Sequence, residues 1–268
     1  MATINNLLKV LSEQLFISYD SPEREKIKKS VETIKKRLKS YFENEISNIE
    51  LFGSYTRDTI LPRIFDESSD IDIMIIFNTS TEEYLPETYR NKLKRFADHY
   101  YSTSEIYKDF PTVVLELNHI KFDLVPVIKR ESIFSSSLYI PNPQNEWIKT
   151  EPKDLNDKLT EVNSNNDFVI KPLIRLFKFW NVNNSKVYSS FELEANIIKI
   201  AETWIFSKNY ESGFFSIIDE LPIWNLPNYK KSKVESLKNN AERVKYYLNQ
   251  DDLEKAKQWL NKIIPFTE

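Results

Sequence analysis

The chain has 268 residues, of which 41% are hydrophobic and 13% aromatic, and its formal net charge is −3. This composition is that of a folded chain large enough for one large domain or two joined lobes, and it excludes a disordered polypeptide. Because there is no cysteine and only two histidines, disulfides, thiolate metal sites and multi-histidine zinc centres are excluded, and any bound metal is expected to have carboxylate oxygen ligands.

The sequence also restricts the cellular location and the binding partners that we expect for the chain. No apolar run approaches the roughly 20 residues that span a bilayer, and the first residues lack the pattern of an export signal. We therefore expect a cytoplasmic protein with no membrane partner. The slightly negative charge argues against long nucleic acid as a ligand, since domains that bind it are usually basic.

Two helices are predicted at the N-terminus. The first covers residues 3–17, and Asp20-Ser21-Pro22 then supplies a cap and a proline suited to the first turn of a second helix. Away from its apolar stripe this second helix carries many lysines, which predicts a solvent-exposed surface, with a partner-binding or nucleic-acid-binding surface as the alternative. Its apolar stripe, at alternating spacings of four and three residues, consists of Ile27, Val31, Ile34, Leu38 and Phe42.

Strand signals follow. Residues 46–52 form a short apolar run that ends at Gly53, and residues 70–77 are dominated by isoleucine. Residues 86–101 have helical periodicity. Residues 111–118 and 120–127 are two β-rich runs, which predicts a hairpin or two adjacent strands.

The remainder of the chain is expected to be helical. The sequence therefore predicts an α+β fold in two lobes: residues 1–135 form a lobe with a mixed sheet and helices, and residues 136–268 form a C-terminal helical lobe. The expected helices cover residues 153–163, 167–182, 190–208, 232–249 and 251–263.

Three acidic residues on predicted strands stand out. Asp70 and Asp72 are two apart on one strand, so both side chains project to the same face. Asp123 is embedded in an apolar strand, where a carboxylate is costly unless it is paired or bound to metal. A divalent cation removes the repulsion between such carboxylates, and three converging acids suit a two-metal centre for phosphoryl transfer. The alternatives are a solvated strand end for the pair and a buried polar contact for Asp123.

A glycine turn precedes these acids. Gly53 and Ser54 follow the first predicted strand, and glycine lets the backbone approach a phosphate closely while the serine hydroxyl adds a donor. No Gly-Lys-Ser/Thr follows, so this turn is not a Walker loop. The order of a strand, Gly-Ser, Asp-x-Asp on a strand and a later strand with Asp favours a catalytic role.

These segments resemble the nucleotidyltransferase superfamily of DNA polymerase β type. More narrowly, they are similar to the branch that contains oligoadenylate synthase, cyclic GMP-AMP synthase, CCA-adding enzymes and bacterial CD-NTases. The residues that carry the resemblance are Gly53-Ser54-Tyr55-Thr56-Arg57-Asp58-Thr59, Ser69-Asp70-Ile71-Asp72-Ile73 and Phe122-Asp123-Leu124-Val125-Pro126.

The resemblance implies roles for these residues. In the family the Gly-Ser motif holds the triphosphate and three acids bind two Mg²⁺ ions, with Mn²⁺ as an alternative. Asp70 and Asp72 would ligate both ions, and Asp123 would position the metal that activates the attacking hydroxyl and would accept its proton. The N-terminal basic helix would act as a spine that links the lobes, with the active site in the cleft between them.

The helical half extends the resemblance. Residues 173–180 and 189–194 are similar to a family helix that ends in Lys-(Tyr/Phe)-Trp, followed by Ser-(Tyr/Phe)-x-Leu-Glu. By this resemblance Lys178 would neutralise phosphate charge, Ser190 would donate to phosphate, and Phe191 would stack on the donor base. The alternatives are a surface lysine and a core aromatic residue. Lys171, Arg175 and Lys178 recur at helical spacing, which predicts an electropositive strip for a polyanion.

The resemblance implies a magnesium-dependent enzyme that joins nucleoside triphosphates (ATP and other bases) into a cyclic or linear oligonucleotide second messenger with release of pyrophosphate. In bacteria this implies antiphage signalling of the CBASS type and regulatory or effector proteins as partners. Two alternatives remain: an enzyme of the same fold with an antibiotic or tRNA 3′ end as acceptor, and a non-catalytic nucleotide-binding module. Base readers are not identified by the sequence; Asn163, Asn165 and Asn166 are candidates, with an ordinary polar loop as the alternative.

Overall fold

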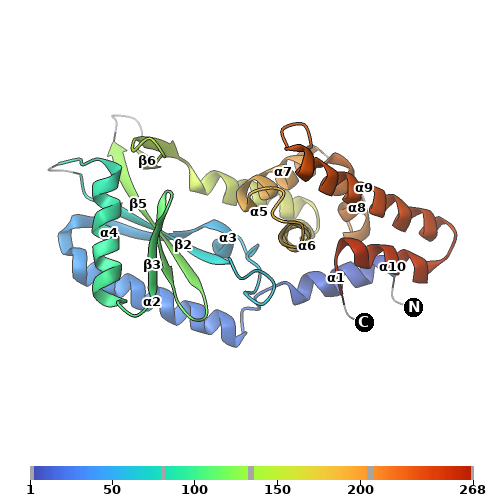
Figure 1. The fold of residues 1–268 in the computed structure, drawn as a ribbon, viewed down its shortest axis with the longest axis horizontal. Helices are drawn as coiled ribbons and strands as arrows, with labels where there is room; N and C mark the ends of the chain where they lie inside the picture. The colour runs from blue at the N-terminus through green and yellow to red at the C-terminus, as the bar shows by residue number, and fades with distance from the viewer. Residues whose placement is uncertain (1–2, 80–81, 132–135, 204–207, 267–268) are drawn as a thin grey trace. The chain divides into compact units, whose positions relative to one another are not determined.

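The computed structural model describes residues 3–79, 82–131, 136–203 and 208–266. Within these ranges the chain alternates helices and strands in its first half and is helical in its second half (Figure 1). The helices are α1 (Ile4–Gln14), α2 (Pro22–Phe42), α3 (Gly53–Thr56), α4 (Pro86–Tyr100), α5 (Pro152–Asn165), α6 (Ile170–Asn183), α7 (Ser190–Thr203), α8 (Tyr210–Glu220), α9 (Asn228–Asn249) and α10 (Leu253–Ile263), with a short 3₁₀ helix at Glu43–Glu45. The strands are β1 (Ile46–Phe52), β2 (Asp70–Phe77), β3 (Glu105–Asp109), β4 (Thr112–Glu116), β5 (Lys121–Glu131), β6 (Ser136–Pro141) and β7 (Trp147–Thr150).

The strands form one mixed sheet. Its main path runs β1-β2-β5-β4-β3, and β6 joins the far half of β5 and carries β7. Strands β2 and β5 are parallel, whereas the other neighbours are antiparallel. The predicted strands at 46–52 and 70–77 and the hairpin of β4 and β5 are confirmed, and so is the α+β fold class.

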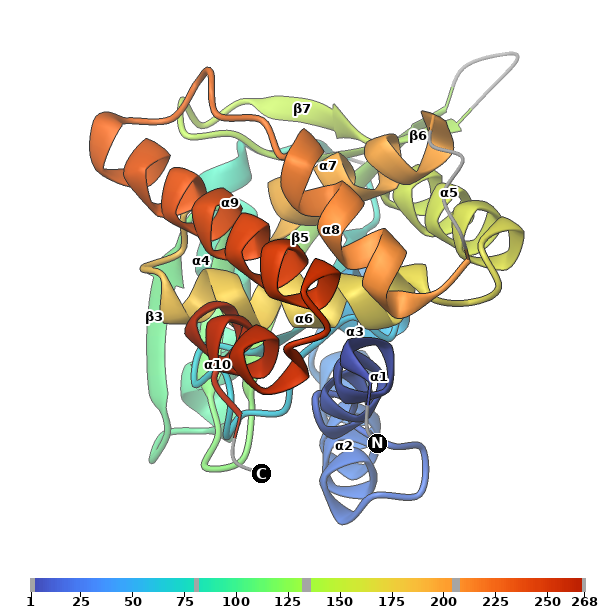
Figure 2. The same cartoon turned by 90° about the vertical axis from the view of Figure 1, so that its right-hand side faces the viewer.

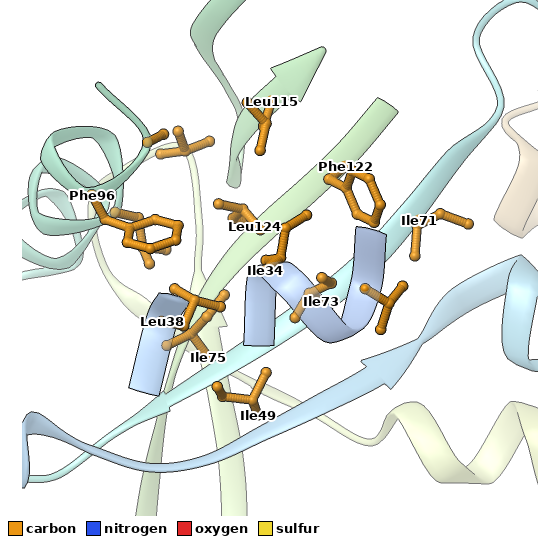
Figure 3. Close-up of a cluster of buried hydrophobic side chains, with 14 of the residues drawn as sticks. Ile34, Leu38, Ile49, Ile71, Ile73, Ile75, Phe96, Leu115, Phe122 and Leu124 are labelled. Carbon is orange, nitrogen blue, oxygen red and sulfur yellow. The ribbon is translucent and has the colours of Figure 1, made fainter. Parts of the chain in front are cut away.

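One face of the sheet is covered by α2 and α4 (Figures 1 and 3). The predicted apolar stripe of α2 is buried from Ile27 to Phe42, and Ser21 caps the helix by accepting a hydrogen bond from the backbone N–H of Arg24. Figure 3 shows Ile34 and Leu38 of α2 and Phe96 of α4 above the isoleucines of β2. This packing fixes which way every side chain of β2 and β5 points, because alternate residues project to opposite faces.

The opposite face of the sheet carries a smaller apolar cluster. Met74 and Ile76 of β2 pack with Val125 and Val127 of β5, and Leu138 lies beside them. The alternate positions of the same two strands belong to the larger core. The smaller cluster therefore marks the sheet face on which residues 70, 72, 121 and 123 must lie.

The chain divides into two compact units. The sheet unit contains residues 17–63 and 67–154, and the helical unit contains the described residues of 1–16, 64–66 and 155–268. In the helical unit α1, α7 and α8 pack against α6, and α9 pairs with α10 (Figure 2). This division differs from the predicted boundary at residue 135, because α1 belongs with the helices and β6 and β7 extend the sheet.

Several elements differ from the sequence prediction. Strands β3, β6 and β7 and helix α8 were not predicted. Strand β3 (Glu-Ile-Tyr-Lys-Asp) has three charged residues among five, and among the described strands it pairs with β4 alone. An edge strand needs less apolar surface than a central one, so its signal in the sequence is weak. Helix α7 is described only to Thr203, and residues 204–207 of the predicted helix lie outside the described residues. Among the helices that the structure describes, none is long and apolar enough to cross a membrane.

Candidate active site

The three predicted acids lie on one face of two neighbouring strands. In the parallel pairing of β2 and β5, Asp72 is the register partner of Asp123, and Asp70 is the partner of Lys121. Ile71 and Ile73 point into the core on the other face. The structure therefore brings together the Asp-x-Asp pair and the later Asp, as the alternation of residues in the sequence predicted.

Asp123 is more buried than Asp70. Its side chain is 16% exposed, and its Oδ1 accepts no hydrogen bond within the part of the chain that the structure describes. Burial and the nearby charge of Asp70 raise the pKa of Asp123 to about 7. A buried carboxylate with an unsatisfied oxygen is unfavourable in a folded protein, so this position is suited to a ligand that supplies positive charge.

Lys121 is the cation beside these acids. Its Nζ lies 3.3 Å from Oδ2 of Asp70 and 3.7 Å from Oδ1 of Asp123. The second distance is an ion-pair contact but is too long for a hydrogen bond, which agrees with the unsatisfied oxygen of Asp123. Sequence reasoning missed Lys121, although its position two residues before Asp123 on the same strand places it on the same face.

The Gly53 turn lies against Asp72. Gly53 has a φ of +76°, and a Cβ built on it would be 1.8 Å from Oδ2 of Asp72. Only glycine can hold this position, both because the backbone is left-handed and because the carboxylate fills the space of a side chain. Ser54 is half-buried, and its carbonyl accepts hydrogen bonds from the backbone N–H groups of Thr59 and Ile60 at 3.0 and 3.2 Å.

The C-terminal end of this turn is held by α2 and by the segment that precedes α2. Asp58 has a left-handed φ of +60°, and its Oδ1 lies 3.1 Å from Nη2 of Arg24. Tyr19 donates a hydrogen bond of 2.9 Å to the other oxygen, and the Arg24 guanidinium stacks on the rings of Tyr19 and Tyr55. Arg24 is therefore a positioning residue for the Gly-Ser turn, and no local pattern in the sequence links it to Asp58.

In the helical unit, Lys178 is buried on α6. It forms an ion pair with Glu194 of α7, whose side chain is fully buried. The alternative of an ordinary surface lysine is therefore wrong. The role of Lys178 toward a triphosphate remains a prediction, and Glu194 is a partner that the sequence analysis did not identify.

The predicted electropositive strip on α6 is not an exposed strip. Arg175 is buried, its Nε donates to the backbone carbonyl of Ser12 at 3.2 Å, and its guanidinium stacks on Phe16. Arg175 thus connects α6 to the N-terminal segment of the same unit. The helical spacing with Lys178 was correct, but the interpretation of the whole strip as a polyanion surface was wrong, because α1 covers Arg175.

Ser190 and Phe191 begin α7. Both are exposed, and the Phe191 side chain is 65% accessible. The alternative of a core aromatic residue is therefore wrong for Phe191, and its ring is available for stacking. The roles predicted for Ser190 and Phe191 toward phosphate and base stay predictions, because these residues belong to the helical unit and the acids to the sheet unit.

Two of the three candidate base readers have structural roles. Asn163 and Asn166 are buried, and the Asn163 side chain accepts a hydrogen bond of 3.0 Å from the backbone N–H of Lys171. The Asn166 amide donates to the carbonyl of Val162 at 2.8 Å. These contacts shape the loop between α5 and α6, so neither side chain faces outward to read a base; Asn165 is exposed.

The acids fit a divalent ion in chemistry and in arrangement. Carboxylate oxygens on one sheet face are the ligands that Mg²⁺ and Mn²⁺ prefer, and Asp123 has an oxygen without a hydrogen bond. As the side chains stand, however, no group of three or more His, Cys, Asp or Glu in the described ranges is close enough to hold an ion.

Known proteins can now be compared with this fold and site. A family model described as "Second Messenger Oligonucleotide or Dinucleotide Synthetase domain" (SMODS) matches residues 1–163. The chain is 28% identical over 204 residues to a probable cyclic nucleotide synthase of Bacillus cereus strain VD146, covering 62% of this chain and 60% of that protein. It is 27% identical over 204 residues to a cyclic AMP-AMP-AMP synthase of an Acinetobacter species, covering 70% of this chain and 56% of that one.

Among solved structures, E. coli MS115-1 CdnC with ATP has the same fold, with a TM-score of 0.71, 12% identity and 98% of each chain covered. CdnC in complex with a HORMA protein gives a TM-score of 0.69 at 11% identity, covering 98% of this chain and 97% of that one. The chain thus has the fold of a CD-NTase. In this chain the acids of β2 and β5 lie on one sheet face, and Gly53 of the Gly-Ser turn lies against Asp72.

The chain belongs to the SMODS family of second messenger oligonucleotide or dinucleotide synthetases. The matched segments span 60% and 56% of the lengths of the two curated relatives.

Proposed function

We propose that the chain is a nucleotidyltransferase that joins nucleoside triphosphates into a cyclic or short linear oligonucleotide, with release of pyrophosphate. The observation that carries the proposal is the placement of Asp70, Asp72 and Asp123 on one sheet face, with the backbone of Gly53 against Asp72. Family membership and the names of the two curated relatives support the reaction class. ATP is the donor that we expect first, since one relative is named for AMP units and CdnC was solved with ATP.

The acids and the turn would bind different parts of the substrate complex. Asp70 and Asp72 would hold divalent metal, and the turn at Gly53 and Ser54 would receive the triphosphate. Bound Mg²⁺ would supply Lewis-acid stabilisation of the charge that develops on the phosphate oxygens. Asp123 would accept the proton of the attacking ribose hydroxyl, because it is a buried carboxylate with an oxygen that makes no hydrogen bond within the described residues.

Three residues of the helical unit have predicted roles toward the nucleotide. Lys178 and Ser190 would contact the triphosphate, and the exposed ring of Phe191 would stack on the donor base. The cytoplasm is the compartment that we expect. A role in antiphage signalling, with a regulatory protein partner, rests on the likeness to CD-NTases and on the complex of CdnC with a HORMA protein.

The test is incubation of the purified chain with ATP, GTP, CTP and UTP and Mg²⁺, followed by mass spectrometry of the products and measurement of pyrophosphate release. We expect a cyclic or linear oligonucleotide and its loss in Asp72→Asn, whereas Asp98→Asn, at an exposed position of α4, retains activity. A product that forms only after addition of an aminoglycoside or a tRNA would assign the other acceptor class. Binding of ATP without turnover would contradict the enzymatic proposal.

A further inference from the structure

Lys121 occupies a particular place in the acid cluster. It is the first residue of β5, the register partner of Asp70, and it lies two positions before Asp123 on the same face. Its side chain is only 15% exposed. A lysine is seldom this buried without a function for its charge, and here the charge lies between two carboxylates.

The contacts of Lys121 are divided between two acids. Its Nζ is 3.3 Å from Asp70 and 3.7 Å from Asp123, so one ammonium group makes an ion pair with an acid on each of the strands β2 and β5. Within the described residues, Lys121 is the cation in ion-pair contact with both of these acids. Burial lowers the pKa of Lys121, but Asp123 and Asp70 more than offset this effect and raise that pKa above its usual value.

The contact with Asp70 competes with assembly of the acids. A divalent ion shared by Asp70, Asp72 and Asp123 needs oxygens of all three, and the described side chains do not gather in that way. Asp70 makes its ion pair with Lys121 instead. An ion that binds there must therefore break the ion pair between Asp70 and Lys121. It is then also repelled by the positive charge of the lysine nearby.

We infer that Lys121 is an internal counter-ion that a divalent metal must displace from Asp70 and Asp123, so that Lys121 weakens binding of metal in the absence of nucleotide. This inference rests on the proposed function, because it concerns the same acids. Its consequence is regulatory: the acid cluster stays neutralised and folded without metal, and metal enters most favourably together with a triphosphate, whose negative charge offsets the ammonium group.

The experiment is titration of the nucleotide-free protein with Mn²⁺, with free Mn²⁺ followed by electron paramagnetic resonance. We expect Lys121→Met to bind Mn²⁺ about 10-fold more tightly than the natural protein, whereas Lys121→Arg stays within about 2-fold. The matched control is Lys129→Met, which removes an exposed lysine from the same strand and leaves Mn²⁺ affinity unchanged.

A stability measurement separates this role from simple packing. In EDTA, Lys121→Met should unfold at a lower temperature than the natural protein, because Asp70 and Asp123 lose their shared cation. Mn²⁺ should then raise its unfolding temperature by more than it raises that of the natural protein. Lys121→Gln repeats both measurements with a polar side chain if the methionine variant does not fold.

The outcomes distinguish the two proposals. If the natural protein binds Mn²⁺ and Lys121→Met binds it equally or more weakly, the counter-ion role is wrong and the metal centre stands. If neither protein binds Mn²⁺ at millimolar concentration, both the metal centre and the role of Lys121 are wrong.

Discussion

The space that a side chain at residue 53 would need is taken by Asp72: a Cβ there would lie 1.8 Å from Oδ2 and 3.1 Å from Cβ of that residue. The turn and Asp72 can therefore lie in contact because residue 53 is a glycine and has no side chain. Because φ of Gly53 is also +76°, the backbone and the neighbouring carboxylate impose the same choice of residue.

Gly53→Ala is therefore expected to lower the free energy of unfolding by at least about 1 kcal/mol and to reduce NTP turnover by about 100-fold or more. The reason is that the added methyl group must push Asp72 or the turn away from its position. Urea denaturation and pyrophosphate release measure the two effects.

A double-mutant cycle tests the cause. In Gly53→Ala with Asp72→Ala the closest clash is removed, since the carboxylate is gone, and the combined loss of stability should be smaller than the sum of the single losses. Additive losses would show that strain at φ alone, rather than contact with Asp72, makes glycine necessary.

The pH dependence of stability should report Asp123. Its pKa rises from 3.8 to about 7 on folding, so between these values the folded protein holds a proton that the unfolded chain has released. Stability of the metal-free protein should therefore fall as pH rises from about 4 to 7, by on the order of 4 kcal/mol from this group.

The measurement is urea unfolding in EDTA at several pH values for the natural protein and for Asp123→Asn. The asparagine variant lacks the titrating group, so its stability relative to the natural protein should increase with pH until about pH 7 and then level off. Asp98→Asn is the control, because it removes an exposed carboxylate of α4 that does not contribute to the pKa of Asp123. Parallel pH curves for the natural protein and Asp123→Asn would mean that Asp123 has an ordinary pKa.

Phe191 should affect substrate binding and leave the fold unchanged. Its ring is 65% exposed, so Phe191→Ala removes little buried area, and the unfolding temperature should stay within about 1 °C. Loss of stacking on the donor base should raise KM for ATP by about 5-fold to 20-fold. Phe168→Ala is the matched control, since Phe168 is 67% exposed in the same unit; an equal KM effect in both variants would contradict a specific role.

The fold and part of the candidate site follow from the sequence where local patterns decide the structure. Alternation along β2 placed Asp70 and Asp72 on one face, and the four-three spacing of α2 gave its buried stripe. The same alternation would have revealed Lys121, had basic as well as acidic residues been considered. The fold class followed because the isoleucine-rich strands and the helical second half have strong, regular signals.

Local sequence patterns do not predict whether a side chain is buried when its contacts come from residues far away in the chain. Arg175 has the spacing of a surface cation, but the carbonyl of Ser12 accepts its hydrogen bond and Phe16 covers its guanidinium. Likewise, the buried Glu194 forms an ion pair with Lys178, which lies on another helix. No window of neighbouring residues contains either contact, so helical spacing alone could not separate a buried cation from an exposed one.

The pair of Lys178 and Glu194 allows its structural role to be measured apart from a role in catalysis. Lys178→Met leaves the fully buried Glu194 without this cation and should lower the free energy of unfolding by about 3 kcal/mol or more. Adding Glu194→Leu removes the buried charge itself, so the double variant should recover at least half of that loss, as measured by urea denaturation.

Activity of this double variant then decides the remaining question about Lys178. If Lys178 contacts the triphosphate, the stabilised double variant should still have a kcat/KM for ATP at least about 10-fold below that of the natural protein, because the phosphate charge is no longer neutralised. Restoration of kcat/KM together with stability would assign Lys178 to the packing of α6 against α7 alone. Glu194→Gln, which keeps the lysine, serves as the reference for changes that arise only from loss of the glutamate charge.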